Sequence, residues 1–389
     1  MLGLGKHLDK FGFKERFEIM LSHLERVMKI CRKYGFQPQM WSDMFFRLVY
    51  GGEYYTENKE ASKEFFDKIP KDITLIYWDY YSYDYDRYNS MMKQHLGISE
   101  KIGFAGGAWK WTGFTPQNHF SLKTNESAIR ACKDNKIDTF ILTTWGDNGA
   151  EASVYSVLPT MFFTAEKAYS ETVDTANFKT LTAISFDDFM AIDLPCRILG
   201  TEKEHNNASK FLFYDDILIG TFDSLVFEGL GKVYTKNSEK LDAVIKNAGH
   251  YSYLFSVQKK LCDVLTIKSE LGKHIKSAYD TGDKDTLLFI AKEVLPNLKK
   301  RISDFYEAFK YQWHRENKSF GFEVQCARIG GLIARVDYVS ERIFDFCSGN
   351  IPKIDELSET RLAFNYFEVD SIERLTYNLW SNTISPSVV

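Results

Sequence analysis

Short apolar runs that end in an aromatic residue followed, two positions later, by an acidic or a second aromatic residue recur along the first part of this chain, and they constrain its fold more than any other feature. The pairs are Trp41-x-Asp43, Tyr77-x-Asp79, Trp109-x-Trp111 and Trp145-x-Asp147. Their first members lie roughly 32 to 36 residues apart, about the length of one strand followed by one helix. The spacing therefore predicts consecutive β/α units.

The last of these runs shows why the strand ends deserve functional interest. Residues 140–144 are apolar or β-branched, which is typical of a strand covered on both faces. Because side chains alternate along a strand, Trp145 and Asp147 are expected on one side if the extended conformation continues that far. A flat apolar face beside a hydrogen-bond acceptor suits a sugar ring. For any single strand end, packing at a rim is the alternative interpretation.

The segments between the runs favour helices. Residues 14–34 carry apolar side chains at steps of three and four before Gly35, and residues 124–137 and 156–170 are also predicted helices. Functional residues at the C-terminal ends of successive parallel strands are typical of a (β/α)8 barrel. A full barrel takes about 250 residues. Only about four units fit before residue 170, so either the fold is not a barrel or part of the barrel is missing.

Several segments resemble one enzyme family. MLGLGKHLDKFG, MWSDMFFR, YWDYY, GGAWKWTGFTP and TTWGDNGAEAS are similar to the second half of the catalytic barrel of glycoside hydrolase family 20, the β-N-acetylhexosaminidases. FLFYDDILIGTFD, YSYLFSVQKKLCDVL and NKSFGFEVQCARIGGLIAR extend the resemblance to bacterial exo-β-N-acetylglucosaminidases with a helical C-terminal domain. The resemblance implies an α/β fold. Residues 1–172 are expected to form the second half of a (β/α)8 TIM-type barrel, about strands 5 to 8, and residues 173–389 a mainly α-helical domain.

The family's catalytic pair is an adjacent Asp-Glu, which the resemblance places just upstream of this sequence. The chain is therefore expected to be a fragment of a retaining, substrate-assisted exo-β-N-acetylhexosaminidase. Such an enzyme removes terminal β-linked N-acetylglucosamine or N-acetylgalactosamine, and the substrate's own acetamide attacks the anomeric carbon. The missing N-terminal half of the same enzyme is an implied partner, and the chain alone is expected to be inactive.

The resemblance assigns substrate binding to the first two strand ends. Tyr77 is expected to hydrogen-bond the acetamide oxygen, so that it takes part in orienting the acetamide. Trp41 is expected to wall the pocket for the acetamide methyl, and Asp79 to accept from a sugar hydroxyl. Asp43 is either a support for these residues or, as we favour, a structural residue.

The other two strand ends receive related roles from the same resemblance. Trp145 is expected to form the apolar floor under the sugar ring, and Asp147 to accept from a hydroxyl, although the family often has Glu there. Trp109 or Trp111 is expected to pack at the edge of the pocket or at the next subsite. For Glu151 the structural interpretation is again favoured.

The second half of the chain carries long helical stripes of apolar residues, which are typical of a domain core. They are Leu254, Val257, Leu261, Val264 and Leu265; Leu287, Ile290, Ala291, Val294 and Leu298; and Leu332, Ile333, Val336, Val339 and Ile343. Gly330 and Gly331 lie within the third stripe and cost about 1 kcal/mol each relative to Ala. They indicate close approach of another backbone, either within the domain or in the homodimer that the resemblance favours.

Composition excludes several other classes. A net charge of -4 and a pI near 6.1 argue against nucleic-acid binding, and no apolar run reaches membrane-spanning length. The six cysteines lack metal or redox spacing, so no metal or cofactor is expected and a cytoplasmic location is favoured. Two alternatives stay open: another barrel glycosidase that uses Asp43, Asp79 or Asp147, and a non-catalytic sugar-binding or helical dimerisation fragment.

Overall fold

The computed structural model describes residues 2–56, 63–199 and 207–364, and these residues form two compact units. The first, here called the sheet unit, comprises Met1–Ala108, Ser121–Thr143 and Phe163–Val173. The second, the helical unit, comprises Trp109–Phe120, Thr144–Phe162 and Asp174–Val389. The loops that follow the third and fourth strands therefore belong to the helical unit. The predicted domain boundary after residue 172 stays a prediction.

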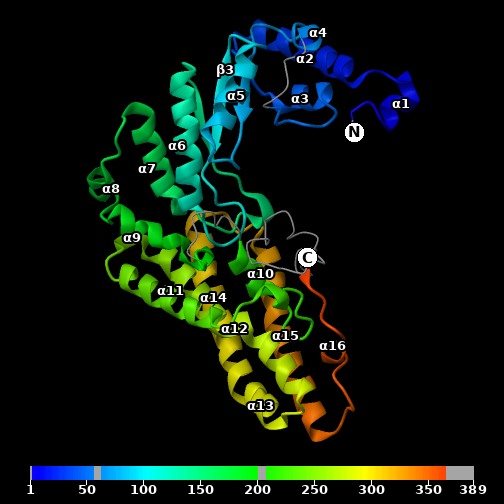
Figure 1. The fold of residues 1–389 in the computed structure, drawn as a ribbon, viewed down its shortest axis with the longest axis vertical. Coiled ribbons are helices and arrows are strands. Elements are labelled where there is room, and N and C mark those ends of the chain that lie inside the picture. Colours follow the sequence, from blue (N-terminus) through cyan, green and yellow to red (C-terminus); the bar gives the residue numbers. More distant parts are fainter. Residues whose placement is uncertain (1, 57–62, 200–206, 365–389) are drawn as a thin grey trace. The chain divides into compact units, whose positions relative to one another are not determined.

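Four parallel strands form the sheet in the order of the sequence, and Figure 1 labels the third of them. They are β1 (Gln39–Trp41), β2 (Thr74–Trp78), β3 (Ile102–Gly107) and β4 (Phe140–Thr143). Trp41 pairs with Ile76, and Tyr77 with Phe104. All of β3 is buried, whereas β4 is only half-buried. Each predicted β/α strand is thus confirmed, but β4 is less covered than its apolar sequence predicted, because its one partner among the described residues is β3.

Helices precede the first strand, connect consecutive strands and follow the last strand, as the spacing predicted. They are α1 (Lys6–Phe11), α2 (Arg16–Lys33), α3 (Asp43–Val49), α4 (Lys63–Phe66), α5 (Tyr85–Leu96), α6 (Asn118–Asp134) and α7 (Leu158–Tyr169). The predicted helix at 14–34 is confirmed by α2, which buries Phe17, Leu24 and Met28. These side chains join a core with Phe104 of β3 and Met91 of α5. The core is therefore built between the sheet and its connecting helices.

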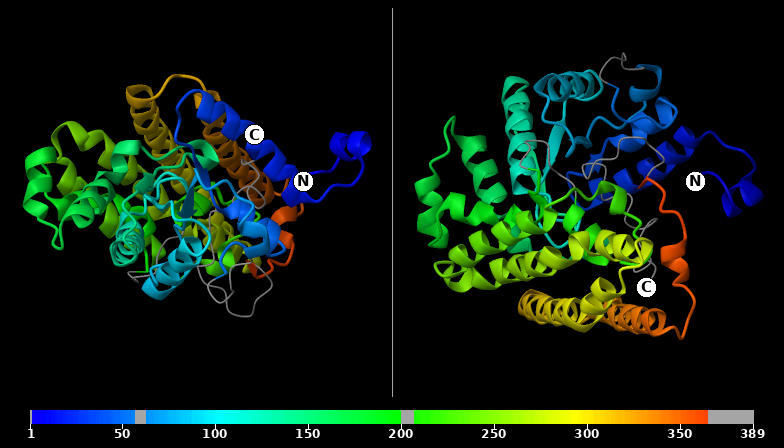
Figure 2. Two further views of the ribbon diagram at one scale, coloured as in Figure 1. Left: turned by 90° about the horizontal axis from the view of Figure 1, so that it is seen from above. Right: turned by 60° about the horizontal axis from the view of Figure 1, so that its bottom comes forward.

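The helical unit contains the longest helices of the chain. Its α-helices from residue 174 onward are α8 (Thr175–Thr182), α9 (Phe186–Met190), α10 (Ala208–Tyr214), α11 (Leu230–Ile245), α12 (Ser252–Asp280), α13 (Lys284–Phe289), α14 (Leu295–Glu316), α15 (Phe322–Ser348) and α16 (Asp355–Ser358), and α12, α14 and α15 are the longest among the described residues. Helices α12, α14 and α15 run side by side (Figures 1 and 2). Most members of the three predicted stripes are buried, which confirms them as core.

A proline marks a local distortion in this bundle. One turn of π-helix, Ile290–Val294, joins α13 to α14, and Pro296 stands in the first turn of α14. Proline lacks the backbone N–H that an α-helix interior needs. The π turn thus falls just before the proline that lacks this N–H, within the second predicted stripe.

The surroundings of Gly330 and Gly331 contradict one part of the prediction for these glycines. A Cβ atom added at either glycine meets no heavy atom within 4 Å among the described residues. Both glycines are exposed on α15, next to the exposed Ala327 and Ala334. Close approach of a backbone within the helical unit is therefore wrong for the described part of the chain, and the dimer interpretation stays a prediction.

Candidate functional site

Two of the predicted sugar-binding residues of the sheet unit meet at the end of β2. The Tyr77 hydroxyl lies 3.2 Å from Oδ2 of Asp79, and Arg87 Nε donates to the same oxygen at 3.0 Å. The other carboxylate oxygen accepts from the backbone N–H of Tyr81 at 2.9 Å. Tyr77 and Asp79 are both buried. The alternation of side chains along the strand does bring them together, as period-two geometry requires.

The ionisation of this pair is governed by burial. Burial raises the pKa of the Tyr77 hydroxyl well above its ordinary value, so the phenol is a proton donor at any ordinary pH. Burial also raises the pKa of Asp79, against the opposing effect of the neighbouring Arg87 cation. Arg87, whose guanidinium also lies 4.0 Å from the centre of the Tyr55 ring, was missed from the sequence. Its signal was a single cation within the tyrosine-rich stretch after β2.

The end of β1 presents Trp41 and then turns immediately into a helix. Trp41 is the last residue of β1, and its surface is 38% exposed. Asp43 opens α3 and accepts a hydrogen bond from Arg47 Nε at 3.3 Å, one helical turn later. Carboxylates near a helix N-terminus are stabilised by the helix dipole. These contacts give Asp43 a local structural role, in agreement with the favoured interpretation.

A buried chain of hydrogen bonds behind these residues was also missed. The backbone N–H of Trp78 donates to the Tyr54 hydroxyl at 3.0 Å, and that hydroxyl lies 3.0 Å from Ser42 Oγ. Ser42 Oγ lies 2.8 Å from Nε2 of His95, while Nδ1 of His95 lies 2.7 Å from the Met91 carbonyl. Each of these hydrogen bonds has one donor and one acceptor if His95 is neutral, with its proton on Nδ1. Burial favours this form because it lowers the pKa of His95 to about 4.

The candidates in the helical unit differ from one another in exposure. Trp109 and Trp111 stack with ring centres 4.7 Å apart, and both are buried. Trp145 is 40% exposed, and Asp147 is exposed at the start of a 3-10 turn, Asp147–Gly149. Since β4 ends at Thr143, the extended conformation does not continue to Asp147. The Trp145 side chain is therefore partly accessible, whereas Trp109 and Trp111 stack on each other and are buried; their roles in sugar binding stay predictions.

Lys110, which lies between Trp109 and Trp111 in the sequence, adds a charge to this region. Lys110 is buried and donates to the Ala152 carbonyl at 3.2 Å. Burial lowers its pKa, whereas the carboxylates of Glu316 and Asp147 act in the opposite direction. The sequence signal was a lone cation inside the aromatic pair Trp-x-Trp.

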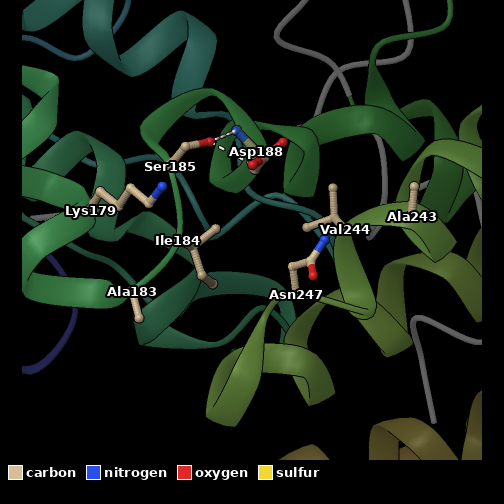
Figure 3. Close-up of a pocket in the computed structure, with 8 residues that line it drawn as sticks. All are labelled: Lys179, Ala183, Ile184, Ser185, Asp188, Ala243, Val244 and Asn247. Carbon is tan, nitrogen blue, oxygen red and sulfur yellow. Dashed lines mark hydrogen bonds between the residues drawn. The ribbon is translucent and has the colours of Figure 1, made fainter.

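The open hollow in Figure 3 is remote from most of these residues in sequence. It is lined by Lys179, Ala183, Ile184, Ser185, Asp188, Ala243, Val244 and Asn247. Ser185 Oγ donates to Asp188 Oδ2 at 2.6 Å and accepts from the Asp188 N–H at 3.1 Å. These bonds cap α9, so Ser185 and Asp188 already serve the fold.

No metal-type cluster occurs in the part of the chain that the structure describes. No group of three or more His, Cys, Asp or Glu residues there is arranged to hold an ion. Likewise, none of the described helices is long and apolar enough to cross a membrane. All six cysteines are free thiols, although Cys326 is exposed rather than part of a core.

Comparison with known proteins relates the second half of the chain to one family. Residues 187–376 match the sequence model of the Glycoside Hydrolase 20C C-terminal domain. The matched segment is just under half of the chain, and it is helical where the structure describes it. No curated protein matches the chain.

Among solved structures, the chain is similar to a GH138 enzyme targeting pectin rhamnogalacturonan II. The sequence identity is 9% and the TM-score 0.36, over 90% of this chain and 75% of that chain. At this TM-score the similarity carries no argument about fold or function.

Proposed function

We propose that this chain is the sugar-binding part of a retaining, substrate-assisted exo-β-N-acetylhexosaminidase. The observation that carries the proposal is the match of residues 187–376 to the Glycoside Hydrolase 20C C-terminal domain. It is supported by the resemblance of the preceding strand ends to the barrel of that family. The substrate would be a glycan with a terminal β-linked N-acetylglucosamine or N-acetylgalactosamine.

The sheet supports the idea of half a (β/α)8 barrel. Four parallel strands follow one another in sequence order, with helices between them, as they do in such a barrel. Among the described residues, β1 and β4 each pair on one side only. Sheet edges attract further strands because their backbone groups are unpaired. We infer that further strands of the same enzyme complete these two edges.

Uncovered apolar side chains near the start of the chain support the same proposal. The exposed large hydrophobic residues in this region are Leu4, Leu8, Phe11, Phe13, Val27, Ile30, Tyr34, Phe36, Trp41 and Met44. Several are aromatic, and Phe13 is 73% exposed. Large apolar side chains left exposed in this number over one short stretch of chain suit a surface that another segment covers. The proposed occupant is the N-terminal half of the barrel, which would bury these residues beside β1 and α2.

The proposed chemistry uses the residues of the sheet unit to hold the acetamide group. The Tyr77 hydroxyl, kept protonated by burial, can donate to the acetamide oxygen. An acetamide held near its attack geometry lowers the entropic part of the barrier. The Trp41 indole would contact the acetamide methyl, and Asp79 would accept from a sugar hydroxyl. The adjacent Asp-Glu pair that protonates the leaving oxygen and orients the acetamide nitrogen would come from outside this sequence.

The residues of the helical unit would contribute a platform and an acceptor. The exposed face of Trp145 suits the apolar C–H face of a pyranose, and Asp147 would accept from a hydroxyl near O4 or O6. A sugar lacking that hydroxyl leaves the acceptor unpaired, at a cost of about 1 to 3 kcal/mol if the site is dry. Trp109 and Trp111 would pack at the edge of the pocket.

Calorimetric titration of the chain with N-acetylglucosamine tests the sugar-binding proposal. We expect saturable binding that Trp145→Ala weakens at least tenfold. Tyr169→Ala is the matched control, because Tyr169 is also an exposed aromatic residue, at 95%, and has no proposed role. Absence of binding to the folded chain, or equal loss in both variants, would contradict the proposal.

Hydrolysis of an aryl β-N-acetylglucosaminide separates the remaining possibilities. We expect no turnover by the chain alone and turnover when the upstream Asp-Glu half is supplied. Turnover by the chain alone would instead favour a glycosidase that uses Asp43, Asp79 or Asp147. In that case Asp79→Asn and Asp147→Asn would identify the carboxylate involved.

We also propose that the chain forms a homodimer, which the family resemblance favours. The exposed glycines of α15 are compatible with such a contact, since a Cβ at Gly330 or Gly331 would meet open space among the described residues. Light scattering of the purified chain tests this directly. A mass of one chain at all concentrations used would remove the proposal.

A further inference from the structure

The loop that carries Trp145 and Asp147 is held by helices that lie far away in the sequence. Although it follows β4 along the chain, the segment Thr144–Phe162 forms part of the helical unit. So does Trp109–Phe120, the loop after β3. The geometry of both loops therefore depends on side chains that the helices supply.

A wholly buried ion pair makes the strongest of these connections. Nζ of Lys210, in α10, lies 2.8 Å from Oε2 of Glu151, and neither side chain is exposed to solvent. Burial lowers the pKa of Lys210, and the Glu151 carboxylate opposes that effect. Two charges removed from water persist only when each compensates the other. Glu151 is consequently fixed opposite Lys210.

Two more helices hold the same glutamate. Gln312 Nε2, in α14, donates to the Glu151 carbonyl at 3.1 Å, and Gln325 Nε2, in α15, donates to Oε1 at 3.4 Å. Arg328 of α15 places a guanidinium nitrogen 3.7 Å from Oε1. Both the backbone and the side chain of Glu151 are thus restrained, which makes this residue an anchor at the base of the loop.

The turn between Asp147 and this anchor has little freedom. Gly149 has φ of +110°, and an added Cβ would lie 3.0 Å from Gln325 Nε2 and 3.3 Å from Glu151 Oε1. Ala150 also has a positive φ, at 50°. Residues held in such conformations need support from their surroundings. The position of the anchor therefore determines where the turn, and Trp145 and Asp147 before it, can lie.

Lys210 contacts the other loop as well. Its Cβ and Cδ atoms lie 3.2 Å from the position of a Cβ added at Gly113, in the loop that carries Trp109 and Trp111. Nearby, Asn207 Nδ2 donates to the Thr112 carbonyl. The aliphatic stem of Lys210 thus packs on one loop, while its ammonium group binds the other.

We propose that Lys210 is a positioning residue that acts through Glu151 to set the orientation of Trp145 and Asp147 for sugar binding. This inference rests on the proposed function, because it assigns a task to the sugar-binding loop. Loss of the ammonium group would leave a buried carboxylate whose principal partner is gone. The loop would then move so that Glu151 reaches water, and Trp145 would move with it.

Fluorine NMR of the chain labelled with 5-fluorotryptophan tests the positioning role. The Trp145 resonance is identified by its loss in Trp145→Phe. We expect Lys210→Met to shift or broaden that resonance and to weaken binding of N-acetylglucosamine at least fivefold. The double variant Glu151→Gln/Lys210→Met removes both charges together, so it should return the resonance and bring the affinity within twofold of the original chain.

Lys268→Met is the matched control. Lys268 is another buried lysine of the helical unit, but its ammonium group binds the Leu212 and Asp215 carbonyls. Its loss should lower the melting temperature without moving the Trp145 resonance. If Lys210→Met does not fold, Glu151→Gln alone provides the same test, because it removes the anchoring charge without changing side-chain size.

The possible results separate this inference from the proposed function. A folded Lys210→Met chain that keeps both the Trp145 resonance and the sugar affinity would overturn the positioning role. An equal movement of the resonance in Lys268→Met would overturn it as well. If Lys210→Met moves the resonance but the original chain binds no N-acetylglucosamine, control of the loop is upheld and the proposed function fails.

Discussion

The hydroxyl of Tyr77 lies 3.2 Å from the carboxylate of Asp79, two residues further along the same chain, and both side chains are buried in the sheet unit. A donor and an acceptor that already bind each other are kept in place until a ligand replaces one partner. The Asp79 carboxylate also accepts from Arg87, so it can release the tyrosine without losing all of its compensation. The pair is therefore suited to exchanging an internal hydrogen bond for one to a carbonyl oxygen.

Tyr77→Phe tests the proposed contact with the acetamide. We expect the variant to lose about 1 kcal/mol of unfolding free energy, because one buried hydrogen bond disappears. Its affinity for N-acetylglucosamine should fall at least tenfold, while any affinity for glucose should change little. Calorimetric titration with both sugars measures the difference.

Tyr88→Phe is the control for that experiment. Tyr88 is also buried in the sheet unit, and its hydroxyl donates to the Ser82 carbonyl at 2.5 Å. A similar loss of stability with unchanged sugar affinity is expected. Equal effects of the two variants on both sugars would argue against a specific acetamide contact of Tyr77.

Because His95 is buried, we expect the free energy of unfolding to fall as the solution becomes acidic. Burial lowers its pKa from 6.5 to about 4 in the folded chain, so the unfolded chain binds the proton more readily. Its stabilising contribution is complete above pH 6.5 and is lost as the pH falls toward 4. The expected loss at pH 5 is about 2 kcal/mol. Urea unfolding at pH 7.5 and pH 5 measures it.

The variant His95→Gln isolates this effect from that of other ionisable groups. The variant should be less stable at pH 7.5, because the bonds to Ser42 Oγ and the Met91 carbonyl change. Its further loss between pH 7.5 and pH 5 should be smaller by about 2 kcal/mol than that of the original chain. The same pH dependence in both chains would show that His95 is not the titrating group.

The sequence predicted the strands and the long helices because their signals are local. Apolar runs and helical stripes depend on neighbouring residues, and Phe104 and Leu261 are buried as such patterns require. The orientation beyond the strand end was not predictable in the same way. Whether Trp145 and Asp147 share a side depends on where β4 stops and on the turn that follows.

The partners of the buried charges were even harder to predict from one sequence. Glu151 was interpreted as structural without any indication of Lys210 or Arg328, since these residues come from helices much later in the chain. No period or motif connects them. A charge expected to be buried does require a compensating charge, but the choice among many lysines and arginines needs the tertiary structure.

Gly149→Ala tests whether the turn after Asp147 requires glycine. An alanine there must adopt φ near +110° and places its Cβ 3.0 Å from Gln325 Nε2. We expect a loss of about 1 to 3 kcal/mol from the strained backbone alone. The melting temperature and the Trp145 resonance should both change. A fully stable variant would mean that the turn adapts without help from its surroundings.

Gly330→Ala should have the opposite effect in an isolated chain. Gly330 lies within α15, and an added Cβ meets no described atom within 4 Å. Alanine is favoured over glycine inside a helix by about 1 kcal/mol, because glycine loses more backbone entropy on folding. Thermal unfolding at low protein concentration should therefore show a higher melting temperature.

The same substitution also tests the proposed homodimer. If Gly330→Ala lowers the melting temperature at high protein concentration, or shifts a dimer to a monomer in light scattering, a second chain approaches the Gly330 face of α15 closely. A gain in stability at every concentration would show that the proposed homodimer, if it forms, uses another surface.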